Sequence, residues 1–234
     1  MRGWGRLRPV QMQDALRQVQ AGSAAQLLAE AYDIAPAQAA AVIREVERAF
    51  AWGLETSSLN RGGLADLVEA IGRVDKAKYV GGGNLIHDEA ARAEGERVLT
   101  HLLDLGDARP VLTARIARRA GVDEAAVAAM LPGLAVLTLV NLANRARSTL
   151  GALLAVMPPL GPWSKGSPHA DLADILRRRC GGGRYASRQL YRAVRLRLAR
   201  AGGFGSFGVF GWYVRFALRP ADTALRRLLG RISS

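Results

Sequence analysis

Apolar residues recur at helical spacing along two stretches of this chain, and the two stretches match one another. With Leu28 aligned to Ile116, the apolar positions stay in step as far as Leu54 and Leu142. Spacing of this kind is typical of the buried faces of helices. Because one helix pair alone buries too little surface, the repeat predicts two units that close a single core. The aligned pairs are Ala39 and Val127, Val42 and Met130, Ile43 and Leu131, Val46 and Leu134, Ala49 and Leu137, and Trp52 and Val140.

The rest of the chain is also predicted to be helical. Alanine and leucine are abundant and runs of β-branched residues are scarce, which favours an all-α fold. We expect a duplicated domain of helix-turn-helix-like units at residues 1–160, with repeat units at about 26–72 and 114–160. A linker at 161–169 then leads to a basic, helical, aromatic-rich appendage at 170–234. The predicted helices cover residues 11–20, 24–32, 36–54, 63–71, 90–103, 110–120, 123–144, 149–157, 185–200 and 221–231.

The stretch from 125 to 144 carries no charged side chain, and about 20 such residues are enough to cross a bilayer. The aligned helix of the first unit favours a buried core helix instead, because it is amphipathic. Its polar side is predicted to carry Arg44, Glu45, Glu47 and Arg48. Pro132 and Gly133 are also expected to break the uncharged helix near its middle.

Positive charge is concentrated in the last third of the chain. The formal net charge is +13, and residues 161–234 hold fourteen arginines and one lysine against three aspartates. Such asymmetry indicates a polyanion or an anionic membrane surface as the partner. The alternative is that the charge serves solubility alone.

A basic amphipathic helix is predicted within this charged region, at 185–200. Leu190, Tyr191, Val194 and Leu198 share one face of it, and arginines line the other. A helix of this kind lies on an anionic membrane or packs on its own domain. The predicted anionic-surface contacts are Arg184, Arg188, Arg192, Arg195, Arg215, Arg219, Arg226 and Arg227.

Three Phe-Gly triplets follow that helix, within an uncharged segment at 201–214. The segment is too short to span a membrane comfortably, and its frequent glycines disfavour a helix. Aromatic side chains next to arginines suit a membrane interface. The predicted aromatic docking residues are Phe204, Phe207, Phe210, Trp212 and Tyr213.

The leading functional hypothesis is peripheral association with an anionic membrane surface. The alternative is sequence-independent binding of RNA or DNA by arginine contacts and aromatic stacking. In a third interpretation the aromatic residues fold back as a structural lid, and the protein is a protein-interaction module. A single cysteine, Cys180, and an N-terminus without an apolar run favour a cytoplasmic protein, at most peripheral to the inner membrane. The sequence leaves the physiological ligand and the oligomeric state open.

The sequence contains no catalytic or metal-binding constellation. His87, His101 and His169 are far apart and have no cysteine pair nearby. His101 is expected to be a partly buried histidine on an apolar helix. The glycine runs at 81–84 and 181–184 lack the Gly-Lys-Ser/Thr ending of a phosphate-binding loop. We therefore expect a non-enzymatic protein with no cofactor, no metal and no small-molecule substrate.

One helix pair has the residue spacing of a DNA-binding helix-turn-helix, with Gly121 in the turn. A recognition helix needs side chains such as Arg, Asn, Gln or Lys near its start to reach the base edges. This helix starts with Asp123 and Glu124, which would repel phosphates, followed by alanines. The pair is therefore interpreted as a packing unit in which Asp123 caps the second helix.

Three segments of the chain resemble motifs of a known bacterial family. They are Glu94–Leu103, Ile116–Asp123 and Met130–Ala135. They show a glycine-polar segment leading to His-Leu, a Gly-Val-Asp turn and a Met-Leu-Pro-x-Leu-Ala helix. Together they resemble an uncharacterised bacterial domain-of-unknown-function family related to YidB-like proteins, over roughly residues 26–160. The resemblance implies an all-helical bacterial domain without an established activity, so it assigns no catalytic residue. The family pattern does not account for the residues after 161.

Overall fold

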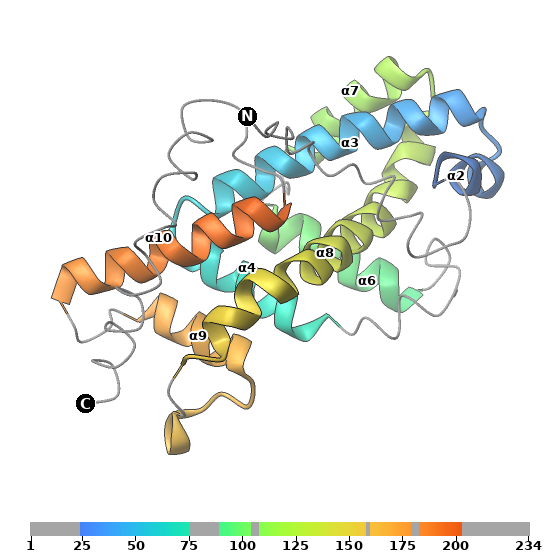
Figure 1. Cartoon of the computed structure of the whole chain (residues 1–234). Coiled ribbons are helices and arrows are strands. Elements are labelled where there is room, and N and C mark those ends of the chain that lie inside the picture. The colour runs from blue at the N-terminus through green and yellow to red at the C-terminus, as the bar shows by residue number, and fades with distance from the viewer. Residues whose placement is uncertain (1–23, 75–88, 104–107, 158–159, 179–182, 203–234) are drawn as a thin grey trace, which may run out of the picture.

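The structure, a computed structural model, describes residues 24–74, 89–103, 108–157, 160–178 and 183–202. Every regular element in these ranges is a helix (Figure 1), which confirms the all-α fold. The predicted helices at 11–20 and 221–231 lie outside the described residues. In chain order the elements are α2 (Ala24–Tyr32), α3 (Pro36–Ser57), α4 (Arg61–Arg73), α6 (Glu89–Arg97), the π-helical turn η1 (Val98–Leu102), α7 (Arg109–Ala120), α8 (Glu124–Leu154), the 3-10 turn η2 (Gly161–Trp163), α9 (Pro168–Arg177) and α10 (Gly183–Gly202).

The long helix α8 forms the centre of the fold (Figure 1), and α3, α4, α6, α7 and α10 pack against it. Side chains along most of its length are buried, among them Leu131, Leu134 and Val140. By length and composition alone α8 could cross a membrane, but 61% of its most apolar window is buried inside the protein. This burial supports the prediction of a core helix at 125–144.

Asp123 caps the start of α8. Its carboxylate accepts hydrogen bonds from the backbone amides of Ala125 and Ala126, at 2.9 Å and 3.3 Å. Glu124 adds a second negative charge in the first turn, where the helix dipole favours one. Both acids therefore stabilise their own helix, as the helix-packing interpretation predicts.

Replacing Asp123 by alanine should lower the free energy of unfolding by about 1 kcal/mol, because two amides lose their acceptor. Asp123→Ser should lose much less, since a serine hydroxyl can accept the same hydrogen bonds. Thermal melting of both variants checks this. If Asp123→Ala melts together with the parent protein, the cap contributes nothing to stability.

The α2–α3 and α7–α8 turns share their backbone geometry. Asp33 and Gly121, which align in the repeat, both adopt a left-handed conformation, with φ of 49° and 65°. In each turn the next amide, of Ile34 or Val122, donates to the carbonyl five residues earlier, at 3.0 Å and 3.1 Å. This conformation favours glycine, and Asp33 is the one non-glycine residue of the described part that adopts it. The shared turn supports the repeat, although superposition of 26–56 on 114–144 stays a prediction.

Most of the aligned apolar positions are buried, but Trp52 is not. Val46 and Leu134, for example, are 0% and 1% exposed, whereas Trp52 is 63% exposed opposite a buried Val140. Phe50, 1% exposed, fills the core from this turn of α3 instead. Because Trp52 lies two residues further along the helix, it points to the opposite side. The prediction that Trp52 is a core residue is wrong.

The two units diverge after their long helices. α3 ends at Ser57, and the side chain of Asn60 caps α4 by accepting from the Gly63 amide at 2.6 Å. A Cβ on Gly63 would lie 2.3 Å from the carbonyl oxygen of Ser57, so this turn requires glycine. The aligned Gly151 has nothing within 4 Å, and α8 continues to Leu154. The predicted separate helix at 149–157 is therefore wrong, because no tight turn interrupts α8 there.

Helix α6 crosses α8 at Gly95 and Pro132. A Cβ on Gly95 would lie 2.0 Å from the carbonyl oxygen of Pro132, so the two backbones touch. Pro132 is buried inside α8, which continues through it. The predicted break at Pro132 is wrong: although proline lacks an amide hydrogen, the buried Leu131 and Leu134 on either side hold the helix in the core.

Helices α9 and α10 belong to the same core as α8. Leu176 of α9, which packs on α4, and Leu198 of α10, which packs on α8, are both 0% exposed. Residues 161–169 form η2 and the start of α9, where the hydroxyl of Ser167 accepts from the Ala170 amide at 3.1 Å. The predicted linker and separate appendage therefore do not describe residues 161–178 and 183–202, because the buried side chains of α9 and α10 are continuous with those of α8.

Candidate anionic-surface interface

The apolar face of α10 anchors this helix on the core. Leu190, Val194 and Leu198 are at most 1% exposed. The Tyr191 hydroxyl donates a hydrogen bond to the carbonyl oxygen of Ser58 at 2.7 Å. Burial raises the pKa of Tyr191 above its ordinary value, which keeps this donor protonated. Of the two alternatives for the amphipathic helix, the described residues show packing on its own domain.

Arginines occupy the other side of α10. Arg188 and Arg192, one helical turn apart, are exposed at the predicted positions. Arg200 is exposed two turns further on. It is not among the predicted contacts because it is rotated away from the stripe formed by Arg188 and Arg192.

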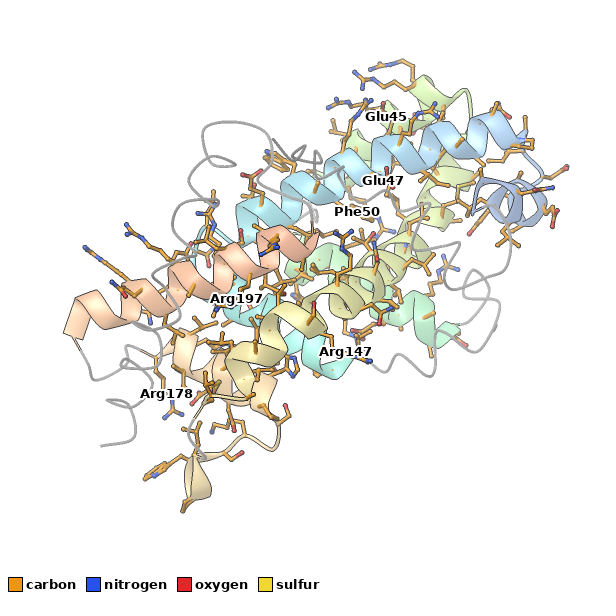
Figure 2. All side chains as sticks on the ribbon, viewed as in Figure 1. Glu45, Glu47, Phe50, Arg147, Arg178 and Arg197 are labelled. Atoms are coloured by element: carbon orange, nitrogen blue, oxygen red, sulfur yellow. The ribbon has the colours of Figure 1, made fainter. Side chains whose placement is uncertain are left out.

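Two other arginines of α10 turn toward the protein. Arg195, a predicted surface contact, is half-buried, and its Nε donates a long hydrogen bond of 3.4 Å to the hydroxyl of Ser58. It follows the buried Val194 directly, so it lies at the margin of the buried face. Arg197, labelled in Figure 2, is also half-buried, with Nη1 3.4 Å from the carbonyl oxygen of Ala193.

The charge of the exposed arginines of α10 is not balanced within their own helix. Glu45, labelled in Figure 2, pairs with both Arg48 and Arg119, at 2.6 Å and 2.7 Å. In contrast, α10 contains six arginines and no acidic residue. Arg188, Arg192 and Arg200 form no ion pair with any described residue. Their charge is therefore not neutralised locally and attracts anions.

More than half of the chain matches a bacterial family. A profile described as bacterial protein of unknown function (DUF937) covers residues 14–145. The chain belongs to this family. No match was found among curated proteins or among solved structures. The DUF937 match ends inside α8, so α9 and α10, with the exposed arginines, lie beyond it. The relation to YidB-like proteins stays a prediction.

The segments that suggested the DUF937 family have structural roles in the fold. Gly121 forms the left-handed turn, Asp123 caps α8, and Gly95 meets Pro132 where α6 crosses α8. His101 has no such role. It is exposed on η1, not partly buried as predicted, because the leucines before and after it fill the core from this turn.

Several predicted site residues of this DUF937 protein lie outside what the structure describes. For Arg184 the structure gives a place on α10 but does not describe the side chain. The exposure of the remaining residues, and with it the lid hypothesis, therefore stays a prediction. These are Arg215, Arg219, Arg226 and Arg227 among the basic contacts, and Phe204, Phe207, Phe210, Trp212 and Tyr213 among the aromatic ones.

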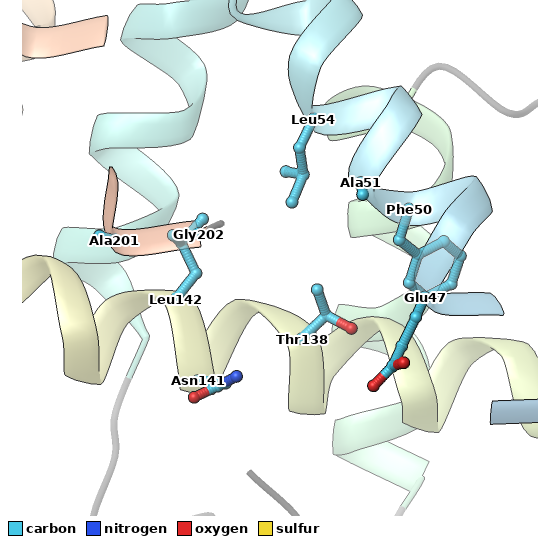
Figure 3. Close-up of a pocket in the computed structure, with 9 residues that line it drawn as sticks. All are labelled: Glu47, Phe50, Ala51, Leu54, Thr138, Asn141, Leu142, Ala201 and Gly202. Atoms are coloured by element: carbon cyan, nitrogen blue, oxygen red, sulfur yellow. The ribbon is translucent and has the colours of Figure 1, made fainter. Parts of the chain in front are cut away.

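A cavity of about 60 Å³ lies beside the C-terminal end of α10, between α3 and α8 (Figure 3). Glu47, Thr138 and Asn141 form its polar side, as Figure 3 shows. Oε1 of Glu47 is buried here, although Glu47 belongs to the predicted polar side of α3 and its residue as a whole is half-buried. Its position one turn after the buried Ile43 places it at the edge of the apolar face. The cavity is too small for an organic ligand.

Proposed function

We propose that the chain attaches peripherally to an anionic membrane surface through the exposed arginines of α10. The observation that carries the proposal is that Arg188, Arg192 and Arg200 are exposed on a helix without acidic residues and form no ion pair among the described residues. The buried opposite face holds this helix rigidly on the core. Rigid presentation lowers the entropy that is lost on binding.

The apolar face of α10 is buried on the core and is not available to the lipid. The attachment through α10 is therefore electrostatic. An arginine near an anionic leaflet contributes about 1 kcal/mol. Together, Arg188, Arg192 and Arg200 would then contribute about 3 kcal/mol, roughly a 100-fold change in affinity. The contribution of these arginines should decrease as salt screens it. In this proposal the predicted aromatic docking residues at 204–213 add a part that survives salt.

The test is flotation of the full chain with vesicles that contain phosphatidylglycerol, at low and high salt, and with purely zwitterionic vesicles. We expect binding to the anionic vesicles alone. The triple variant Arg188→Gln, Arg192→Gln, Arg200→Gln should bind roughly 100-fold more weakly at low salt, since it loses about 3 kcal/mol.

A matched control removes the same charge from another surface. Arg44, Arg115 and Arg118 are also exposed and form no ion pair among the described residues. The triple variant Arg44→Gln, Arg115→Gln, Arg118→Gln should keep most of the binding. Equal losses in the two triple variants would show that net charge, not α10, is responsible. No binding to anionic vesicles at low salt would eliminate the proposal.

Nucleic acid is the main alternative partner, because arginines also contact phosphates. The capped and acidic start of α8 argues against recognition of bases by the helix-turn-helix. The remaining mode of nucleic-acid binding is sequence-independent contact of the α10 arginines with phosphates. A fluorescence titration with single-stranded RNA on the same variants distinguishes the two partners. If the chain binds RNA tightly, if this binding weakens steeply with salt and if the chain does not bind vesicles, the partner is RNA and not a membrane.

A further inference from the structure

A charged cleft of about 400 Å³ lies between α4 and the α6–η1 segment, and the side chain of Arg177 from α9 reaches it. The volume falls within the range of small-molecule sites. Val98 and Leu102, both at most 5% exposed, provide an apolar floor. The cleft lies on other helices than the exposed arginines of α10, so its role does not depend on the proposed membrane attachment.

One nitrogen of Arg177, Nη2, is engaged by two carboxylates at the cleft. Its guanidinium donates to Asp66 at 2.6 Å and to Glu69 at 2.5 Å. The hydrogen bond from Arg177 holds the pKa of Glu69 below its ordinary value, and the bonds to both acids raise the pKa of Arg177. Arg177 and Glu69 therefore remain charged, and the pairs of Arg177 with Asp66 and Glu69 tie α9 to α4.

Arg73 and Arg97 are held much less firmly. Their side chains are 67% and 65% exposed. Nη1 of Arg73 lies 3.8 Å from Oε1 of Glu69, and the same carboxylate pairs more closely with Arg177, at 2.5 Å. Arg97 pairs at 2.6 Å with Glu94, three residues earlier on the same helix. Exposed pairs of this kind contribute about 0–1 kcal/mol, and a guanidinium has further N–H groups to donate.

His101 joins these two arginines at the cleft because of the π-helical turn. The Leu103 amide donates to the carbonyl of Val98, five residues earlier, at 2.9 Å. This wider turn buries the leucines at 99, 102 and 103 and leaves His101 exposed at the cleft. His101 forms no hydrogen bond or ion pair with any described residue. Turns of this type occur frequently at functional sites.

We propose that this cleft binds the phosphate group of a small organic phosphate through Arg73, Arg97 and His101. Two guanidinium groups and an imidazole supply donors from separate positions around the cleft, which suits the several oxygens of a phosphate. The floor at Val98 and Leu102 accommodates the carbon part of the ligand. Arg177 is not among the proposed phosphate ligands, because its Nη2 already donates to Asp66 and Glu69 and its side chain is less exposed than those of Arg73 and Arg97.

The experiment titrates inorganic phosphate and glycerol 3-phosphate into the full chain, with chloride at equal ionic strength as the salt control. Binding is followed by calorimetry and by the imidazole C–H signals of the histidines, among which His101→Gln identifies the signal of His101. We expect saturable binding that shifts the His101 signal, with glycerol 3-phosphate bound more tightly. The double variant Arg73→Gln, Arg97→Gln should lose at least tenfold in affinity.

Arg92→Gln is the matched control, since it removes an exposed arginine from α6 outside the cleft. It should bind like the parent protein, and so should the α10 triple variant. A lipid headgroup is the other source of the same phosphate chemistry. If vesicles with phosphatidylglycerol shift the His101 signal in the α10 triple variant and soluble phosphates do not, the ligand is a lipid phosphate. If neither probe shifts that signal saturably, or the double variant retains the shift, the proposal is overturned.

Discussion

Replacing Leu134 by aspartate, or Val46 by aspartate, should each destabilise the protein by more than about 4 kcal/mol. Both side chains are essentially inaccessible, at 1% and 0% exposure, and they align in the two halves of the repeat. A carboxylate at either site loses its hydration without gaining a partner, or binds a proton at a cost in free energy. Chemical unfolding and near-ultraviolet circular dichroism should show loss of the native state.

Val111→Asp is the control for this prediction. Val111 is 73% exposed, so an aspartate there remains hydrated and stability should change by less than about 0.5 kcal/mol. If Val46→Asp or Leu134→Asp unfolded at the same denaturant concentration as Val111→Asp, the shared core of the two units would be refuted.

Adding a single methyl group at Gly95 should also have a large effect. The new Cβ would lie 2.0 Å from the carbonyl oxygen and 2.4 Å from the carbonyl carbon of Pro132. Because both are backbone atoms of α8, no side-chain rotation relieves the clash, and α6 has to move away. We expect Gly95→Ala to lose about 2 kcal/mol or more of unfolding free energy, as overpacked cores do.

Gly151→Ala is the matched comparison, because it adds the same methyl group to α8 where nothing lies within 4 Å. Alanine is favoured over glycine in a helix by about 1 kcal/mol, so this variant should gain stability. Opposite shifts of the two melting temperatures would establish that the crossing of α6 and α8 is the cause. A Gly95→Ala protein that melts above the parent protein would show that the backbones do not touch.

Helix type and the buried faces of the repeat could be predicted from the sequence because they depend on local spacing. The end of α2 at Tyr32 coincides with the predicted end, since the left-handed turn at Asp33 and Pro36 limit the helix there. The end of α8 could not be predicted in this way. Whether a helix stops at a glycine depends on what approaches it: Gly63 is confined by Ser57, whereas Gly151 is open.

Prediction of the candidate interface from the sequence has a similar limit. The amphipathic pattern places Arg188 and Arg192 at the surface, because an unpaired guanidinium is too costly to bury. The same pattern does not tell whether Val194 and Leu198 contact lipid or protein, since both environments are apolar. The charged cleft was missed for a related reason. Spacing puts Arg97 and His101 on one face of a segment, but it does not reveal that α4 lies opposite.

The position of α8 in the chain has a consequence for synthesis on the ribosome. A helix this long and apolar, if exposed alone, has the length and composition of a segment that is inserted into membranes. The helices α3, α4 and α6, which cover it, precede it in sequence and leave the ribosome first. The covering surface is therefore made before the helix that needs it, and α9 and α10 complete the cover afterwards.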